Sequence, residues 1–291
     1  MSLTMLPQWC ADIIANPPRS GEGFHNWLFR AARGLWKCGR EADDIREILE
    51  NAATTCGRHV SGREITDAVR NSQASAFQPA RAQHRWPNVN HEQREAVIAT
   101  GSGVVDLWEM SPIRFEDNAL HTEEIIDALF PANPLLCVGQ SSREFKTRHR
   151  DELRGDLSAL ALIVPNQMTA RIGRTQDGKE SEHALENTGP RRFLVIEQDG
   201  GTTDEQAAVL LHLAERAPLA VVVHSGSKSI HGWFYCGEQP EEKLHEFMRY
   251  GVSLGADRAT WTRSQFVRMP DGTRDNGNLQ TVYFFNPNVV R

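Results

Sequence analysis

The first third of the chain carries apolar side chains at the spacing of amphipathic helices. Between residues 24 and 77 this spacing occurs in three stretches. The apolar positions of the first stretch are Leu28, Ala31, Ala32, Leu35 and Trp36. A second stretch, 45–52, follows an acidic start at 41–44. The third follows Ser61, with Glu64 at the position of a capping box. The pattern predicts three short helices that form a small bundle.

From residue 135 onward the pattern changes to short apolar runs bounded by turn-forming residues, which is typical of strands. Two runs, at 193–196 and 219–223, are separated by an amphipathic stretch at 205–216 that predicts a helix. The remaining runs are 135–138, 159–164, 266–269 and 281–285. Pro-Asp-Gly and Asp-Asn-Gly join the last two runs, which therefore predict a long hairpin. These features predict an α+β domain with a largely antiparallel sheet.

Residues 76–87 separate the two patterns. This stretch contains Pro79 and Pro87 and has no apolar periodicity, so it reads as a linker. A chain of 291 residues is long enough for two domains. We therefore expect a helical bundle with its linker over residues 1–85 and a second domain over residues 86–291.

The composition is that of an ordinary globular protein, with 40% hydrophobic and 24% charged residues. A net charge of -6 argues against a protein that coats nucleic acid by bulk charge. The five cysteines are scattered without a CxxC pair, so a structural zinc site is not expected. No apolar run approaches the roughly 20 residues that cross a bilayer, and the N-terminus lacks the pattern of a signal peptide. We expect a cytoplasmic protein with no membrane partner.

Candidate chemistry begins at the end of the run 193–196, where Glu197 and Asp199 follow two positions apart. Side chains alternate along a strand, so both carboxylates point to one face, with Cα atoms about 6 to 7 Å apart. Two metal ions roughly 3.5 to 4 Å apart fit between such groups, which is the geometry used for phosphoryl and nucleotidyl transfer. The simpler interpretation is a strand that ends in solvent at the turn Gly200-Gly201.

A second feature is the small-residue turn after the run 219–223. Its backbone amides, with Ser225, Lys228 and Ser229, could hold a triphosphate, and His231 begins the next strand. A plain hairpin turn with a surface lysine and a partly buried histidine explains the same residues. The turn lacks GxxxxGK[ST], so the sequence gives no support for ATPase chemistry.

A third feature is Asp257, which precedes a segment with Arg263 and Arg268. Asp257 could be the N-cap of a short helix. It could equally be a third carboxylate that joins Glu197 and Asp199, with the two arginines near a nucleotide or a template strand.

Taken in order, the three features resemble the archaeo-eukaryotic primase superfamily, and within it the prokaryotic primase-polymerases. The matching elements are a strand that ends in acid-x-acid, a small-residue turn with Ser-x-His, and a lone Asp followed by Arg-x-Pro. The resemblance covers roughly residues 135 to 291. It implies an RRM-like antiparallel palm, here preceded by the helical bundle. It also implies DNA primase or polymerase activity, in which nucleoside triphosphates are added to a primer or a first nucleotide on a DNA template.

By position, the resemblance implies that Glu197, Asp199 and Asp257 hold Mg²⁺ or Mn²⁺ and that His231 contacts the phosphates of the nucleotide. Arg268 would lie beside that nucleotide and Arg263 beside the nucleic acid. The first acid is commonly Asp in this family, and here it is Glu197. A longer carboxylate still offers the hard oxygen that Mg²⁺ prefers, but it shifts the position of the metal.

A basic cluster with Arg143, Lys146 and Arg148 around Phe145 suits a groove that follows a template backbone. A solvated helix face explains the same charges. The N-terminal helices resemble the small helical domain of such primases, which in relatives commonly follows the catalytic domain. A bundle that serves only packing or partner binding is the alternative.

Two other functions compete with synthesis. The acidic net charge and the glutamate at position 197 favour a non-catalytic binding module of a replication complex. A metal-dependent nuclease could use the same acids, but the Ser-x-His turn suits a triphosphate better than a scissile backbone. Because the sequence carries no helicase motor, the resemblance implies a separate replicative helicase as partner, encoded alongside on a mobile element.

Overall fold

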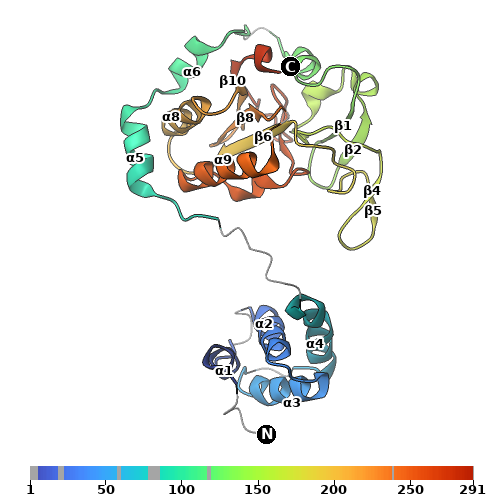
Figure 1. The fold of residues 1–291 in the computed structure, drawn as a ribbon. Helices are drawn as coiled ribbons and strands as arrows, with labels where there is room; N and C mark the ends of the chain where they lie inside the picture. Colours follow the sequence, from blue (N-terminus) through green and yellow to red (C-terminus); the bar gives the residue numbers. More distant parts are fainter. Residues whose placement is uncertain are drawn as a thin grey trace. The chain divides into compact units, whose positions relative to one another are not determined.

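The chain divides into two compact units, Met1–Arg85 and Trp86–Arg291, in a computed structural model (Figure 1). The described residues are 6–18, 23–57, 60–77, 86–116, 119–237 and 239–290. The boundary lies within the stretch 76–87, which the sequence pattern marks as a linker. Residues 78–85 of that linker lie outside the described residues.

The smaller unit is a bundle of helices. They are α1 (Gln8–Ala15), α2 (Phe24–Lys37), α3 (Ala42–Ala53) and α4 (Gly62–Phe77). Helices α2 to α4 confirm the three predicted helices, and the backbone N–H of Glu64 donates to Ser61 Oγ at 3.2 Å, as one half of a capping box. The predicted apolar positions form the core, where Leu28, Leu35 and Leu49 are fully buried.

Helix α1 has no counterpart among the sequence predictions. An eight-residue helix is too short to be stable alone, so it depends on tertiary contacts. Cys10 and Ile14 enter the core of the bundle, and Trp27 Nε1 donates to the carbonyl oxygen of Ile13 at 2.7 Å. These long-range contacts are invisible to a search for helical periodicity.

The larger unit contains two four-stranded antiparallel sheets, with strand orders β10-β7-β8-β6 and β2-β1-β3-β9. The strands are β1 (Leu135–Gly139), β2 (Phe145–His149), β3 (Leu162–Ile163), β6 (Phe193–Gln198), β7 (Leu219–His224), β8 (Ile230–Tyr235), β9 (Val267–Arg268) and β10 (Val282–Phe285). A small separate hairpin pairs β4 (Gly173–Arg174) with β5 (Glu180–Ser181). The α+β class and the antiparallel character of the sheets are as predicted.

Helices cover one face of the first sheet, and the second sheet packs against the other (Figure 1). The helices of this unit are α5 (His91–Thr100), α6 (Val104–Met110), α7 (Thr122–Leu129), α8 (Thr203–Ala214) and α9 (Glu241–Ser253). Along β6, Leu194 and Ile196 pack into the core beneath α8 and α9, whereas Phe193 and Val195 pack into the core between the sheets. Across both units, none of the described helices has the length and apolar character to span a membrane.

Two expectations about strands are wrong. The runs 266–269 and 281–285 do not pair as a hairpin, because β9 pairs with β3 in the second sheet and β10 pairs with β7 in the first. The turn-rich segment between them crosses from one sheet to the other. The basic stretch 145–149 is the edge strand β2 and not a helix face.

Candidate functional site

The acid pair lies at the end of β6, on the face that looks toward the second sheet. Phe193 and Val195 bury their side chains on that face, and the alternation of the strand places Glu197 and Asp199 next in the same row. The Glu197 side chain is 23% exposed and the Asp199 side chain 56% exposed. The row therefore runs from the apolar core to solvent through two carboxylates.

Asp257 joins this pair through backbone pairing. Its N–H donates to the carbonyl oxygen of Glu197 at 2.9 Å, and Ala256 forms an isolated bridge with Gln198. The Asp257 carboxylate also accepts the N–H of Ala259 at 2.9 Å, so it caps the short 3-10 helix η4 (Arg258–Trp261). The capping role proposed from the sequence is present, and it coexists with a position beside the acid pair.

The three carboxylates act on one another electrostatically. Burial raises the pKa of the Glu197 carboxyl to about 7, and the negative charges of Asp199 and Asp257 add to the rise. Arg268 and a hydrogen bond from Ser229 act in the opposite direction but do not cancel it. In the absence of a cation, the Glu197 carboxyl therefore keeps its proton to a higher pH than an ordinary glutamate does.

His231 lies directly across the sheet from Glu197, as its register partner on β8. Its Nε2 atom is 3.4 Å from Glu197 Oε1, and the residue is 2% exposed. Among the described residues, neither ring nitrogen has a hydrogen-bond partner. Burial lowers the pKa of His231 to about 3, helped by the charges of Arg268 and His224. The contact with Glu197 is thus between a neutral imidazole and a carboxyl with a raised pKa, and is not an ion pair.

The turn between β7 and β8 uses its serines internally. Ser225 N–H donates to the carbonyl oxygen of Ser229 at 2.8 Å, and Ser229 N–H donates to Ser225 Oγ at 3.2 Å. Ser229 Oγ donates to Glu197 Oε1 at 3.4 Å. Both serines are buried, so their hydroxyls close the turn and orient Glu197 instead of facing a ligand in solvent.

Lys228, like its neighbour Ser227, is exposed in this turn and can reach a ligand. Its side chain is 72% exposed, and Nζ lies 3.8 Å from Asp199 Oδ1. Gly226 sets the shape of the turn, with φ of 71°, and a Cβ there would lie 2.8 Å from the carbonyl oxygen of Leu279. The turn packs closely against the segment before β10 and presents the lysine to the acids.

Of the two predicted arginines, only Arg268 belongs to the acid group. Arg268 lies on β9. Its burial lowers the pKa of its guanidinium, and the positive charge of Arg274 lowers it further, whereas the negative charges of Glu197 and Asp275 raise it. Its charge acts on both Glu197 and His231. Arg263 instead donates from Nη1 to the carbonyl oxygen of Gly189 at 3.1 Å, a structural contact.

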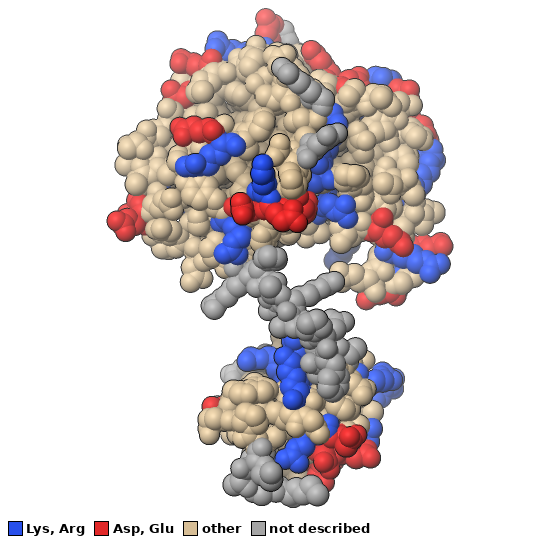
Figure 2. Space-filling model, viewed as in Figure 1, with Lys and Arg blue, Asp and Glu red and all other residues tan. Residues whose placement is uncertain are grey.

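The predicted template cluster lies on β2, at the opposite edge of the second sheet from β9. Arg148 Nη1 contacts both carboxylate oxygens of Glu182 at 2.9 Å, and Lys146 Nζ contacts Asp156 at 3.1 Å. Arg143 is exposed in the turn before β2. The structure therefore does not bring this cluster to the acids. Figure 2 shows charges of both signs over the viewed face of the larger unit, with acidic side chains grouped near its middle and basic ones beside them.

Two residues that the sequence analysis missed hold the site together. Buried Gln206 of α8 donates from Nε2 to the carbonyl oxygens of Lys228 at 3.1 Å and Gly201 at 3.3 Å, and its Oε1 accepts Ile230 N–H at 2.9 Å. It thus ties the loop after β6 to the turn after β7. Arg94 of α5 donates to the carbonyl oxygen of Gly200 at 3.2 Å. Their sequence neighbourhoods carry no signal for this role.

Carboxylates are the natural ligands that this group offers to a hard divalent cation. As the side chains stand, no three His, Cys, Asp or Glu residues of the described ranges are set closely enough to hold a metal ion. Glu197, Asp199 and Asp257 would therefore have to turn toward a cation on binding. A bound cation would offset both causes of the raised pKa of Glu197, first its burial and then the repulsion from Asp199 and Asp257.

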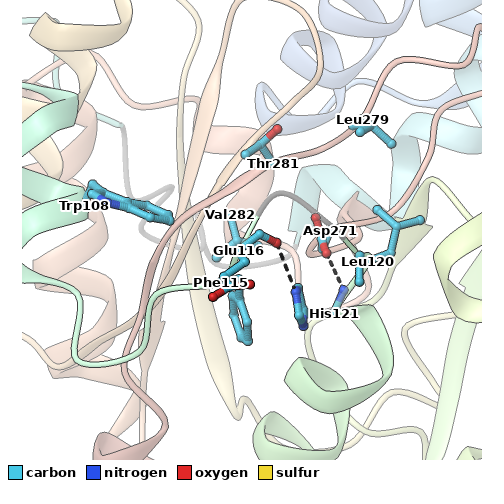
Figure 3. Close-up of a pocket in the computed structure, with 10 residues that line it drawn as sticks. Trp108, Phe115, Glu116, Leu120, His121, Asp271, Leu279, Thr281 and Val282 are labelled. Atoms are coloured by element: carbon cyan, nitrogen blue, oxygen red, sulfur yellow. Dashed lines mark hydrogen bonds between the residues drawn. The ribbon is translucent and has the colours of Figure 1, made fainter.

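A cavity of about 430 Å³ lies elsewhere in the larger unit (Figure 3). Trp108, Phe115, Leu120 and Val282 line it, and none of the three acids does. Its polar groups are engaged locally: the ring of His121 stacks on Phe115 with centroids 4.4 Å apart, and the N–H of His121 donates to the Asp271 carboxylate. We therefore place the candidate site at the acids, where charged groups converge, and not in this cavity.

Comparison with known proteins adds no relative: no protein-family model, no curated protein and no solved structure matches the chain.

Proposed function

We propose that residues 86–291 form a metal-dependent nucleotidyltransferase that extends or starts a nucleic-acid strand on a DNA template. One observation carries the proposal: Glu197, Asp199 and Asp257, which are distant in sequence, converge at the end of β6 beside Lys228, Arg268 and His231. Three carboxylates next to two cations suit a metal-bound triphosphate. Strand separation would fall to a separate helicase.

The donor set fits Mg²⁺ or Mn²⁺. Glu197, Asp199 and Asp257 would hold the ion through carboxylate oxygens, the ligand type that these cations prefer. A bound ion would supply Lewis-acid stabilisation of the attacking and leaving oxygens. A cation would also lower the pKa of Glu197 and so convert it to the ionised form that binds metal.

The remaining side chains of the site supply positioning and charge. Lys228 lies beside Asp199, and the charge of Arg268 acts on Glu197; both cations would hold the phosphates of a nucleotide. Ser229 Oγ donates to Oε1 of Glu197, and His231 Nε2 lies near the same oxygen, at 3.4 Å each. Because His231 is 2% exposed, a direct contact with phosphate would need the Glu197 side chain to move aside.

The order of elements supports an RRM-like palm in part. The strands of the first sheet and their helices, β6, α8, β7, β8, α9 and β10, follow the βαββαβ succession of that fold, but β9, which belongs to the second sheet, comes between α9 and β10. β6 and β8 are adjacent and antiparallel, as expected. The last strand differs, because β10 lies beside β7, whereas in an RRM-like palm the last strand lies beside the first.

Primer extension tests the proposal. The purified chain is given a labelled primer annealed to a DNA template, with deoxynucleotides or ribonucleotides and with Mg²⁺ or Mn²⁺. We expect metal-dependent extension by the wild-type chain and none by Asp199→Asn. The matched control is Asp177→Asn, which removes an exposed carboxylate in the turn between β4 and β5. Extension by Asp199→Asn at the wild-type rate would refute the site assignment.

A second candidate is a module that binds a nucleotide or nucleic acid without catalysis. The observation in its favour is that the three acids, within the described part of the chain, do not form a ready metal site. Under this alternative the chain binds labelled nucleotide or DNA, yet incorporates nothing with either metal. Incubating labelled single-stranded DNA with metal and no nucleotides distinguishes the nucleotidyltransferase and the binding module from a nuclease, because only a nuclease would shorten the strand.

A further inference from the structure

One surface of the bundle combines an exposed indole with a row of cations. Trp9 of α1 is 48% exposed, although large apolar side chains usually bury in a core of this kind. Together with Ile13, Arg30, Arg33, Gly34 and Lys37, it lines a hollow of about 370 Å³ between α1 and α2. We call Trp9, Arg30, Arg33 and Lys37 the Trp9 surface.

The indole is held in place by a glycine on α2. A Cβ at Gly34 would lie 3.2 Å from Cζ3 of Trp9 and 3.2 Å from Sγ of Cys10, so the ring rests closely on the helix backbone. Cys10 and Ile14 on the same helix are buried and anchor α1. The outer part of the ring is thereby presented to solvent in a fixed position, which lowers the entropic cost of stacking a ligand on it.

The cations lie on one face of α2, because residues three and four apart on a helix are neighbours. Arg30 and Lys37 are exposed, and Nε of Arg33 is buried without a hydrogen-bond partner among the described residues. Asp12, one turn after Trp9, accepts a hydrogen bond from Gln8. The ion pairs found among the described residues of the bundle involve other side chains: Arg46 on α3, Arg63 and Arg70 on α4, and His25 on α2.

The charge of the bundle agrees with an anionic partner. Residues 1–85 contain 11 Lys and Arg against 9 Asp and Glu, a formal net charge of +2, whereas residues 86–291 contain 21 against 29, a net charge of -8. Figure 2 shows basic side chains gathered over the part of the bundle where α2 runs in Figure 1. Residues 1–85 thus lack the net negative charge of the larger unit, and two of their eleven cations, Arg81 and Arg85, belong to the linker.

We propose that the Trp9 surface binds single-stranded DNA, with one base stacked on Trp9 and the phosphates on Arg30, Arg33 and Lys37. A flat exposed indole among cations suits an unstacked base with its phosphodiester backbone. Arg30 and Lys37 are about 10 Å apart along the helix axis, the length of about three nucleotides at duplex rise. The choice of DNA over RNA as the ligand rests on the proposed function, whereas the Trp9 surface is inferred from the residues of the bundle alone.

Fluorescence anisotropy of a labelled oligothymidylate tests this with the full-length chain, without nucleotides and with EDTA. For the double variant Arg30→Ala/Lys37→Ala we expect about tenfold or more weaker binding at low salt. The slope of log Kd against log salt should fall by about 1.4, since each phosphate contact on a single strand contributes about 0.7. The control Arg63→Ala/Arg70→Ala removes the same charge from α4 and should bind as wild type does.

Trp9→Leu tests the stacking step. We expect affinity to fall about 5- to 100-fold, the range that base stacking on an aromatic ring provides, and part of the quenching of tryptophan fluorescence by DNA to disappear. Circular dichroism shows whether the variant keeps its helices. If it does not, the double variant of the exposed cations, which touches no packing, still decides the matter.

Three outcomes would overturn the proposal. Equal affinity for wild type and Arg30→Ala/Lys37→Ala would assign the surface to another occupant, such as the acidic face of a protein. An equal loss of affinity in the control Arg63→Ala/Arg70→Ala would show that only the net charge of the bundle matters. Tighter binding of oligouridylate than of oligothymidylate would identify RNA, and not DNA, as the ligand. Binding is measured with EDTA and without nucleotides, so failure of the proposed catalysis leaves this result untouched.

Discussion

Removing the charge of Asp199 should stabilise the protein at alkaline pH even though it removes activity. Burial and two neighbouring carboxylates raise the pKa of Glu197 from 4.5 to about 7. The folded protein therefore binds this proton more tightly than the unfolded chain does. The stability that results is fully present below about pH 4.5 and is lost as the pH rises through about 7. The whole shift corresponds to about 3 kcal/mol.

The contribution of Asp199 to the raised pKa of Glu197 follows from Coulomb's law. Two charges about 6.5 Å apart repel by about 0.6 kcal/mol in water and by about 2.5 kcal/mol at an effective dielectric constant of about 20. Asp199 is 56% exposed, so solvent screening favours the lower part of this range, about 1 kcal/mol. For a unit of this size, that corresponds to a rise in Tm of about 2 to 4 °C.

Thermal and urea unfolding of metal-free protein measure the effect, at about pH 5 and about pH 8. We expect the stability of Asp199→Asn relative to wild type to be higher at about pH 8 than at about pH 5, because the lost contact with Lys228 affects both pH values alike. Asp177→Asn, an exposed carboxylate elsewhere, should show no such difference. An Asp199→Asn variant whose stability relative to wild type does not rise between about pH 5 and about pH 8 would refute the electrostatic account of the site.

Three further predictions concern single side chains. Gln206→Leu leaves two carbonyl oxygens and one N–H of the site loops without their hydrogen-bond partner. The free energy of unfolding should therefore fall by about 3 kcal/mol, and primer extension should fall with it. The control Gln176→Leu, at an exposed position, should change neither quantity. Lys228→Ala should raise the KM for nucleotide about tenfold with little loss of kcat, because an exposed cation contributes mainly to ground-state binding; a lower kcat at unchanged KM would contradict its assigned role. Arg148→Ala should lower stability by about 1 kcal/mol and leave DNA affinity unchanged, since Arg148 and the N–H of Thr147 hold the pKa of Glu182 below its usual value against the effect of burial. A clear loss of DNA affinity in Arg148→Ala would contradict this expectation and show that Arg148 contacts the template.

Local patterns in the sequence are enough to predict helices α2, α3, α4 and α8 and most of the longer strands. The helical stretches after residues 24, 41 and 61 and the strands at 193 and 219 follow directly from apolar periodicity. Pairing is not local, which is why β9 and β10 look like two arms of one hairpin, yet belong to different sheets. Helix α1 depends on burial of Cys10 and Ile14 against α2, and no periodicity within eight residues reveals that.

In the candidate site, too, local sequence patterns predict some features, whereas others depend on contacts between distant parts of the chain. The acid pair can be placed from alternation along β6, because it follows the buried Phe193 and Val195 in register. The meeting with Asp257 depends on backbone pairing after α9, which only the fold provides. The buried serines of the β7–β8 turn illustrate the opposite case: residue type suggests a phosphate cradle, whereas burial commits the hydroxyls of Ser225 and Ser229 to the turn and to Glu197.

The most direct test of the site is calorimetric titration of Mn²⁺ into the full-length chain. The account predicts binding by wild type that weakens strongly in both Asp199→Asn and Asp257→Asn, with Asp177→Asn unchanged. Asparagine keeps the N-cap at position 257, so loss of binding there reports on the charge and not on the helix. Wild-type affinity for Mn²⁺ in Asp257→Asn would contradict the claim that this distant residue completes a cation site with Glu197 and Asp199.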